Sequence, residues 1–289
     1  MNSEKIKNYY RLAKPGIIYG NALTAAAGFI LASKYPVNPK LFLLTLIGIS
    51  FVIGGGCVFN NYLDRSIDSK MERTKRRVLV SGVISGRSSL IYGTILELIG
   101  MLILALHTNL LTFGLAIVGF IFYVFIYTFA KRYTVYSTII GSVSGSIPPL
   151  VGYCAVSNRI DLGAVILFLT ICFWQMPHFY AISIYRVEDY RSAGLPVLSV
   201  QKGTNTAKKH IPFYILAYLV SASLLVFYHY TGLVYLVLVM ISGLVWLAYS
   251  LKGFRSGVSE ESWAKKVFGL SLVVIMLFCL AIPIDKFFR

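Results

Sequence analysis

Three oxygen-bearing side chains, Asn60, Asp64 and Asp68, follow one another at intervals of four residues within the segment NNYLDRSID. On an α-helix, residues i and i+4 lie on the same face, so this spacing predicts a polar stripe along one side of a helix. Two carboxylates held close together repel each other unless a cation lies between them. Mg²⁺ prefers oxygen ligands and is commonly held by one or two carboxylates plus substrate phosphates. The stripe therefore predicts a magnesium site.

A basic cluster follows directly after the stripe, at Arg73, Lys75, Arg76 and Arg77. Arginine forms paired hydrogen bonds with phosphate oxygens. A positive cluster at a membrane edge can also serve only to fix the orientation of the chain. Because acidic groups for a metal stand beside basic groups for phosphate, we favour a diphosphate-binding site.

Glu188 and Asp189, within YRVEDYRSAGLPVL, form a second acidic group at the end of another hydrophobic stretch. Such a pair can simply be solvated and balanced by Arg186 and Arg191. Two acidic groups on the same predicted membrane face, at equivalent positions of two halves, favour a functional role instead.

Lys131 and Arg132, within YTFAKRYT, end a further hydrophobic stretch. From their spacing alone they can be either an anchor at the membrane surface or ligands of an anion, and both interpretations stay open at this point.

His178 lies inside the apolar segment FWQMPHFYAIS, next to Pro177, which is expected to kink the helix or free a carbonyl group. Ionisable groups within membrane spans are candidates for function, although a lone histidine is often only hydrogen-bonded to a neighbour. His178 precedes Asp189 by 11 residues, or roughly 16 Å along a helix. This depth predicts contact with an acceptor substrate. Glu97 is the only acid within an expected span, and we expect it to contact a tyrosine or serine of another helix.

The elements that must position these groups are long hydrophobic stretches. Of the 289 residues, 57% are hydrophobic and only 13% are charged, whereas soluble domains carry roughly 25% charged residues. A bilayer span needs about 20 mostly apolar residues, and the alternation of barrel strands is absent from the sequence. We therefore predict an all-α membrane bundle whose first span is retained. Its nine spans are 16–33, 41–60, 88–106, 111–130, 135–156, 162–184, 211–228, 232–251 and 267–284.

The net charge of +16 is distributed unevenly. If the N-terminus is cytoplasmic, 22 of the 27 Lys and Arg residues lie on the cytoplasmic side, which is the asymmetry of membrane proteins. The C-terminus is then external. This placement favours contact with membrane lipid and excludes nucleic acid as the partner. It predicts a multi-pass protein of the cell (inner) membrane with its functional loops in the cytoplasm.

The chain is expected to form a single domain, 1–289. Two long loops, about 61–87 and 185–210, are separated by four spans, which predicts an internal duplication of a four-helix unit over 14–134 and 135–252, plus a ninth helix. The four cysteines all lie inside spans and are expected to be buried free thiols, at Cys57, Cys154, Cys172 and Cys279.

The first acidic segment resembles the Asn-x-x-x-Asp-x-x-x-Asp motif of the UbiA-type intramembrane prenyltransferases, and YTFAKRYT resembles their basic loop after the fourth helix. The resemblance implies a nine-helix bundle that holds Mg²⁺ and a prenyl diphosphate between two acidic motifs. It implies a catalytic and metal-binding set of Asn60, Asp64, Asp68 and Asp189, and a substrate-binding set of Arg73, Lys75, Arg77, Lys131, Arg132, His178 and Glu188.

Five segments, which span 14–203, resemble the haem-modifying branch of this family: KPGIIYGN, GCVFNNYLDRSIDSKMERTKRRVLVSG, SVSGSIPPLVGYCAV, WQMPHFYAISIYRVEDY and GLPVLSVQKG. This implies transfer of a farnesyl group from farnesyl diphosphate to a vinyl group of haem B with addition of water, giving haem O and diphosphate. Haem B is then a substrate and not a cofactor. Association with a downstream haem A synthase or a terminal oxidase fits the resemblance, although no residue indicates it.

One departure from the wider family is Tyr185, which stands where the second motif usually has the first of two aspartates. It leaves the number of metal ions at the second motif open. Two alternatives also stay open: a quinone-pathway enzyme with an aromatic acid as acceptor, and a haem or lipid carrier without catalysis.

Overall fold

Nine spans, each long and apolar enough to cross a membrane, make up most of the described chain, residues 3–289 of this computed structural model. The all-helical prediction and the number of spans are confirmed. The span helices are α2 (Pro15–Ala32), α3 (Pro39–Asp68), α4 (Gly86–His107), α5 (Leu110–Ile121) continued by α6 (Thr128–Tyr133), α7 (Ser137–Gly145) continued by α8 (Ile147–Ser157), α9 (Leu162–Tyr185), α12 (Thr204–Phe227), α13 (Leu233–Leu251) and α14 (Glu260–Phe287).

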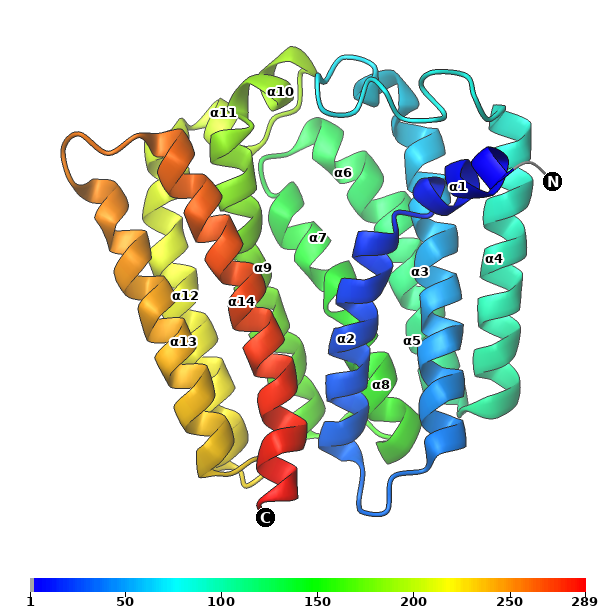
Figure 1. Cartoon of the computed structure of the whole chain (residues 1–289), viewed down its shortest axis with the longest axis vertical. Coiled ribbons are helices and arrows are strands. Elements are labelled where there is room, and N and C mark those ends of the chain that lie inside the picture. The colour runs from blue at the N-terminus through cyan, green and yellow to red at the C-terminus, as the bar shows by residue number, and fades with distance from the viewer. Residues whose placement is uncertain (1–2) are drawn as a thin grey trace.

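The spans form two groups that lie side by side (Figure 1). One group contains α2, α3, α4, α5 and α8, and the other contains α9, α12, α13 and α14. The described N-terminal helix, α1 (Ser3–Leu12), lies across one end of the bundle, while the C-terminus lies at the opposite end. Two short helices, α10 (Val187–Ser192) and α11 (Leu198–Gln201), cover the same end as α1.

Three spans extend further than their hydrophobic stretches predict. The helix α3 continues past 60 to Asp68, and α12 and α14 begin seven residues earlier than expected, at Thr204 and Glu260. Backbone hydrogen bonds continue along a helix beyond the apolar part, so hydropathy alone places its end too early. Because of this extension, Asn60, Asp64 and Asp68 all lie on one continuous helix.

Close helix packing depends on glycines at the contact between α3 and α4. A Cβ atom at Gly100 would lie only 2.7 Å from the carbonyl oxygen of Gly48, and one at Gly55 would lie 3.0 Å from that of Gly93. Small residues allow membrane helices to approach this closely. The two backbones therefore hold the inner face of α3 in a fixed position.

Two spans are interrupted inside the bundle. A π-helical segment, Phe122–Tyr127, separates α5 from α6, and a break at Ser146 separates α7 from α8. Gln175 of α9 crosses to this break and donates 3.0 Å hydrogen bonds to the Ser142 carbonyl and the Ser146 hydroxyl. Irregular backbone at membrane depth needs such internal partners.

The expectation that Glu97 contacts a tyrosine or serine of another helix is wrong. Both carboxyl oxygens of Glu97 are buried without a hydrogen-bond partner in the described chain. The carboxyl group lies against Gly55, where an added Cβ atom would be 2.7 Å from Oε2. No tyrosine or serine of residues 3–289 donates a hydrogen bond to this carboxyl group. The expectation that the four cysteines are buried free thiols is confirmed.

Candidate active site

The predicted polar stripe on α3 is present and buried. Asn60, Asp64 and Asp68 are only 4%, 3% and 5% exposed. The Asn60 amide donates a 2.8 Å hydrogen bond to Asp64 Oδ2, so the four-residue spacing does place these groups on one face. Buried charges are costly unless they are paired, and each of the two carboxylates has a cationic partner.

Asp64 is paired with the basic residues at the end of α6. Lys131 forms an ion pair with Asp64 Oδ2, and Arg132 Nη2 lies 3.5 Å from Oδ1. Arg132 also donates a 2.6 Å hydrogen bond to the Leu63 carbonyl. These contacts bring Lys131 and Arg132 into the buried site, which favours the anion-ligand interpretation over a surface anchor.

The π-helical segment before α6 helps to set this geometry. Thr128 donates a 2.9 Å hydrogen bond to the Tyr123 carbonyl five residues earlier, and its hydroxyl accepts one of 2.9 Å from Asn60. π-Helical turns occur frequently at functional sites. Here the wider turn joins the stripe on α3 to the helix that carries Lys131.

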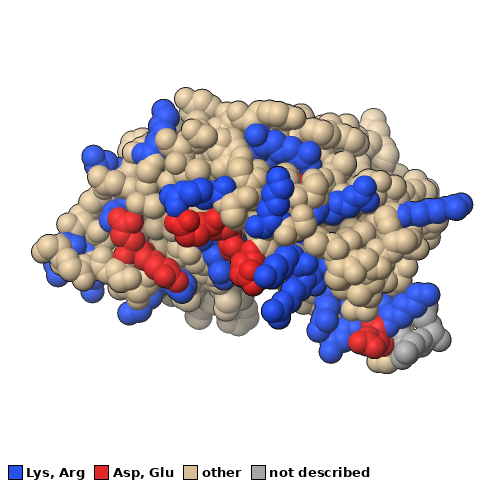
Figure 2. Space-filling view, turned by 90° about the horizontal axis from the view of Figure 1, so that it is seen from above, with Lys and Arg blue, Asp and Glu red and all other residues tan. Residues whose placement is uncertain are grey.

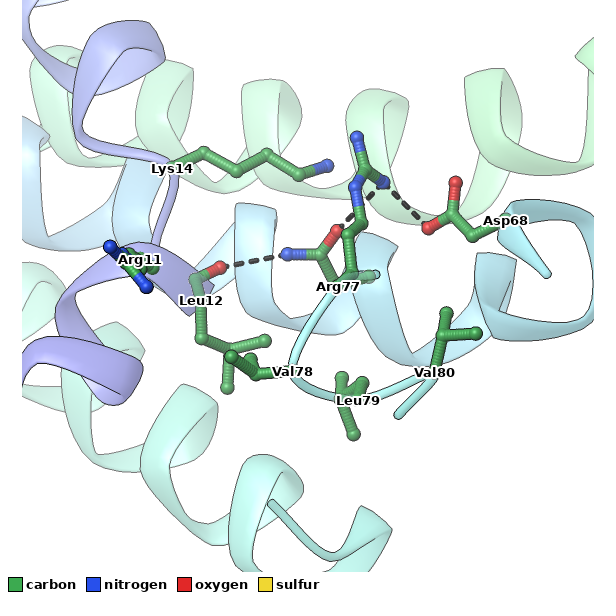
Figure 3. Close-up of a pocket in the computed structure, with 9 residues that line it drawn as sticks. Arg11, Leu12, Lys14, Asp68, Arg77, Val78, Leu79 and Val80 are labelled. Carbon is green, nitrogen blue, oxygen red and sulfur yellow. Dashed lines mark hydrogen bonds and ion pairs between the residues drawn. The ribbon is translucent and has the colours of Figure 1, made fainter. Parts of the chain in front are cut away.

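Asp68 is paired with Arg77 from the loop that follows α3. Arg77 Nη1 lies 2.6 Å from Asp68 Oδ2 and also donates a 3.1 Å hydrogen bond to Asn61 Oδ1. Figure 3 shows this pair, with the Lys14 side chain directed toward the same place. The first basic cluster thus contributes one residue, Arg77, directly to the stripe.

Lys14 was missed by the site prediction, although it stands in the segment KPGIIYGN. Its Nζ donates a 2.8 Å hydrogen bond to Asn60 Oδ1. Its backbone is left-handed, with φ 54° and ψ 67°, a strained conformation for a lysine before a proline. Burial lowers the pKa of Lys14 to about 8. A cation held this way by strained backbone indicates a functional role, and a bound anion would favour its charged form.

A small cavity lies beside these groups (Figure 3). Three cations line it, Arg11, Lys14 and Arg77, together with Asp68 and Asn61 and with the apolar side chains of Leu12, Val78, Leu79 and Val80. Cations converging on a cavity beside a carboxylate suit a phosphate group. Arg11 was also absent from the predicted site.

The other members of the basic cluster lie apart from the stripe. Arg73, Lys75 and Arg76 are exposed, and Lys75 forms a 2.5 Å ion pair with Glu72. Viewed from this end of the bundle, Lys and Arg side chains are spread over the surface, with acidic groups between them (Figure 2). The structure therefore brings one of the four clustered cations to the buried site and leaves three at the surface.

The second acidic group lies next to the loop of the first. Asp189 Oδ1 accepts a 3.0 Å hydrogen bond from the backbone N–H of Glu72, and the Ser192 hydroxyl donates one of 3.0 Å to the Lys70 carbonyl. Glu188 instead is exposed and pairs with Arg191. A second cavity is lined by Tyr185, Arg186, Glu188, Asp189 and, from α14, Glu261. Glu261 was not predicted.

The donor set of the stripe fits Mg²⁺, but it is not a closed cage. No three His, Cys, Asp or Glu side chains gather at metal-binding distance within residues 3–289. Asp64 Oδ1 is buried and accepts no hydrogen bond from residues 3–289, and a carboxylate oxygen is a ligand of the kind that Mg²⁺ prefers. One or two carboxylates suffice when phosphates complete the shell. The residues present therefore fit a metal that binds together with a diphosphate.

His178 faces α14 from the middle part of α9. Its Nδ1 lies 2.7 Å from the Ser271 hydroxyl. Its ring stacks on Trp174 and packs against Phe268, with both centroid distances 4.9 Å. Phe268 in turn contacts Tyr185, at 5.9 Å, so an aromatic wall connects His178 with the second acidic group.

A helical membrane bundle with a buried carboxylate stripe, surrounded by cations, defines a class of membrane enzyme that binds an anionic diphosphate. The chain belongs to the UbiA prenyltransferase family, whose model matches residues 21–277. It is 49% identical over 279 residues to a protein of Protochlamydia amoebophila named protoheme IX farnesyltransferase, covering 96% of this chain and 98% of that one.

Solved structures share the fold. A structure from work on digeranylgeranylglyceryl phosphate synthase aligns with a TM-score of 0.80 at 20% identity, covering 99% of this chain and all of that one. A UbiA homologue from Archaeoglobus fulgidus bound to DMAPP and Mg²⁺ aligns with a TM-score of 0.70 at 17% identity, covering 96% and 99%.

Proposed function

We propose that this protein transfers a farnesyl group from farnesyl diphosphate to a vinyl group of haem B, with addition of water, giving haem O and diphosphate. The acceptor and donor are those of the relative that is 49% identical over nearly the whole chain. The single structural observation that carries the proposal is the buried Asn60–Asp64 pair, which Lys14 contacts from the turn before α2 and Lys131 from α6.

The diphosphate is bound at the end of the bundle that carries the acidic groups. Asn60, Asp64 and Asp68, with Asp189 from the second motif, would hold Mg²⁺. A homologue with the same fold binds Mg²⁺ together with DMAPP, which supports this assignment. When bound, the metal neutralises negative charge on the departing diphosphate. The surrounding cations, Lys14, Arg77, Lys131 and Arg132, donate charge-assisted hydrogen bonds to the same oxygens.

The reaction replaces one carbon–oxygen bond by a carbon–carbon bond. The bond between the allylic carbon of farnesyl and the diphosphate oxygen breaks, and the terminal vinyl carbon of haem B bonds to that allylic carbon. Water then adds to the inner vinyl carbon and releases a proton, while diphosphate leaves. The apolar helices exclude water from the farnesyl chain until this last step. His178 contacts the haem.

The distribution of charges supports our proposal for the membrane orientation. The N-terminal end and the acidic groups lie at the same end of the bundle, and with that end in the cytoplasm 22 of 27 Lys and Arg residues are cytoplasmic. We therefore place the protein in the cell (inner) membrane with its diphosphate site toward the cytoplasm.

Mass analysis of haem extracted from membranes that express this chain tests the proposal. With farnesyl diphosphate supplied, we expect haem B to gain the mass of one farnesyl group plus water, and the Asp64→Asn variant to leave haem B unmodified. Unmodified haem B with the well-folded original chain would overturn the haem acceptor. Prenylation of an aromatic acid would then indicate the quinone-pathway alternative, and absence of pyrophosphate release with either acceptor would indicate a carrier.

A further inference from the structure

The hydroxyl group of Ser271 determines which ring nitrogen of His178 carries a proton. Ser271 Oγ donates a 2.5 Å hydrogen bond to the Phe268 carbonyl, one turn earlier on α14. A serine hydroxyl has one proton to donate. If that proton pointed to His178 instead, the hydroxyl and carbonyl oxygens would face each other at 2.5 Å with no hydrogen between them. The 2.7 Å contact with His178 Nδ1 is therefore donated by the imidazole N–H.

A second contact between the same helices holds the backbone of Ser271 in place. Trp174 Nε1, one turn before His178 on α9, donates a 2.9 Å hydrogen bond to the Ser271 backbone carbonyl. Ser271 is also fully buried. The imidazole is held between Trp174 and Phe268, at 4.9 Å from each ring. Neither the serine nor the imidazole ring can turn away without breaking these contacts.

The other ring nitrogen, Nε2, is left with a free lone pair. Nε2 makes no hydrogen bond to any residue of 3–289. In contrast to the Glu97 oxygens, which also lack a partner, Nε2 is not completely buried. An imidazole whose Nδ1–H is donated to a fixed acceptor is the usual form of a metal-binding histidine. Haem iron takes such a nitrogen as an axial ligand.

The side chains that pack around the His178 ring are aromatic. Trp174, Phe268 and Tyr185 form an apolar, aromatic wall beside His178, and flat aromatic surfaces pack favourably on such rings. The described acidic groups that face this wall, Glu188, Asp189 and Glu261, lie at its outer end around the second cavity.

We propose that Ser271 is a positioning residue that locks His178 in the Nδ1–H form, so that Nε2 binds the iron of the acceptor haem. The proposal rests on the proposed function, since it takes haem B as the substrate. Ser271 itself does not touch the haem; it acts through the imidazole.

Haem titration of the purified protein tests this assignment without turnover. Haem B is added to the original chain and to the variants Ser271→Ala, Ser271→Thr and His178→Ala, while the Soret band and the electron paramagnetic resonance spectrum report the axial ligand. We expect a histidine-ligated spectrum that His178→Ala abolishes and imidazole restores. Ser271→Ala should weaken haem binding about tenfold or more, the usual cost of losing the partner of a ligating histidine. Ser271→Thr should retain binding, because it keeps the hydroxyl.

Ser250→Ala is the matched control. Ser250 is equally buried and donates a 2.7 Å hydrogen bond to the carbonyl three residues earlier, at Leu247, but no histidine contacts it. Its loss should leave the haem spectrum unchanged.

The outcomes separate this proposal from the proposed function. If Ser271→Ala binds haem as the original chain does, the positioning role is wrong. If His178→Ala keeps the spectrum while haem is still farnesylated, the iron ligand is wrong and the function stands. If the folded chain neither binds nor modifies haem, both fail.

Discussion

The two acidic motifs occupy corresponding loops, yet they are built in different ways. Asp64 and Asp68 are buried on the last turns of the 30-residue helix α3 and are paired with cations. Asp189 lies on the six-residue helix α10, beyond the end of α9, and Glu188 beside it is exposed. An acidic sequence becomes a rigid charged site only where other elements enclose it.

The two regions also differ in what surrounds the acids. Around the first motif the neighbours are Lys14, Arg77, Lys131 and Arg132, whereas the second motif continues into the aromatic wall of Tyr185, Phe268 and His178. This division supports the proposal that most diphosphate ligands come from around the first motif and that the aromatic wall beside the second motif faces the acceptor. It also predicts that substitutions have unequal effects in the two regions.

The largest effect is expected for Asp64→Asn, which removes the buried charge that Lys131 and Arg132 share. Turnover should fall by about 100-fold or more, because preorganised charge at the leaving group supplies much of the catalysis. The amide keeps the shape of the side chain, so the protein should remain extractable and monodisperse. Pyrophosphate release measures the loss, and activity near that of the original chain would remove Asp64 from the metal site.

The second-largest effect is expected for Lys14→Met. It retains the length of the side chain but removes the cation beside Asn60, and a charge-assisted hydrogen bond contributes about 1.5–3 kcal/mol. We expect kcat/KM for farnesyl diphosphate to fall about 10- to 100-fold. Lys5→Met, at an exposed position of α1, is the control and should change little. Equal kinetics of the two variants would place Lys14 outside the site.

A smaller and graded effect is expected at the second motif. Asp189→Asn weakens the contact with the Glu72 backbone that joins the two loops, and turnover should fall about tenfold. Glu188→Gln removes only an exposed pair with Arg191 and should change turnover less than about twofold. Steady-state kinetics of both variants measure the contrast. A larger loss for Glu188 than for Asp189 would reverse the assignment of the two acids.

The smallest effect is expected for Glu97→Gln, on α4. Glu97 is a buried acid without a cation, in contrast to Asp64, and the described chain offers its oxygens no hydrogen bond. Glutamine keeps the shape of the side chain, and the substitution breaks no ion pair or hydrogen bond of the described chain, so thermal stability should change little and turnover should stay within about twofold. A thermal melt and the pyrophosphate assay measure both. A loss of turnover comparable to that of Asp64→Asn would give Glu97 a catalytic role.

Much of the site prediction was based on the spacing of residues along a single helix. The interval of four residues placed Asn60 and Asp64 within hydrogen-bond distance because helix geometry is regular. Lys131 and Arg132 entered the site prediction through the resemblance, and the structure places both beside Asp64. Their role as diphosphate ligands stays a prediction. The proposed duplication of a four-helix unit stays a prediction.

Other residues carried no local signal. Lys14 was not among the predicted site residues, and a left-handed turn before Pro15 brings it to Asn60. Glu97 was expected to find a polar partner, but the close approach of α3 and α4 at Gly55 leaves none. Such contacts depend on how closely two backbones pack, and that distance is not written in either segment alone.

The sequence by itself determined the membrane class, the nine spans and the stripe of Asn60, Asp64 and Asp68, because hydropathy and helical periodicity are properties of single segments. The tertiary structure decided which cations meet the stripe and which stay at the surface, as Arg77 and Arg73 illustrate. It also decided that Ser271, 93 residues from His178, sets the form of the imidazole. Contacts between distant segments depend on helix packing, which no local pattern specifies.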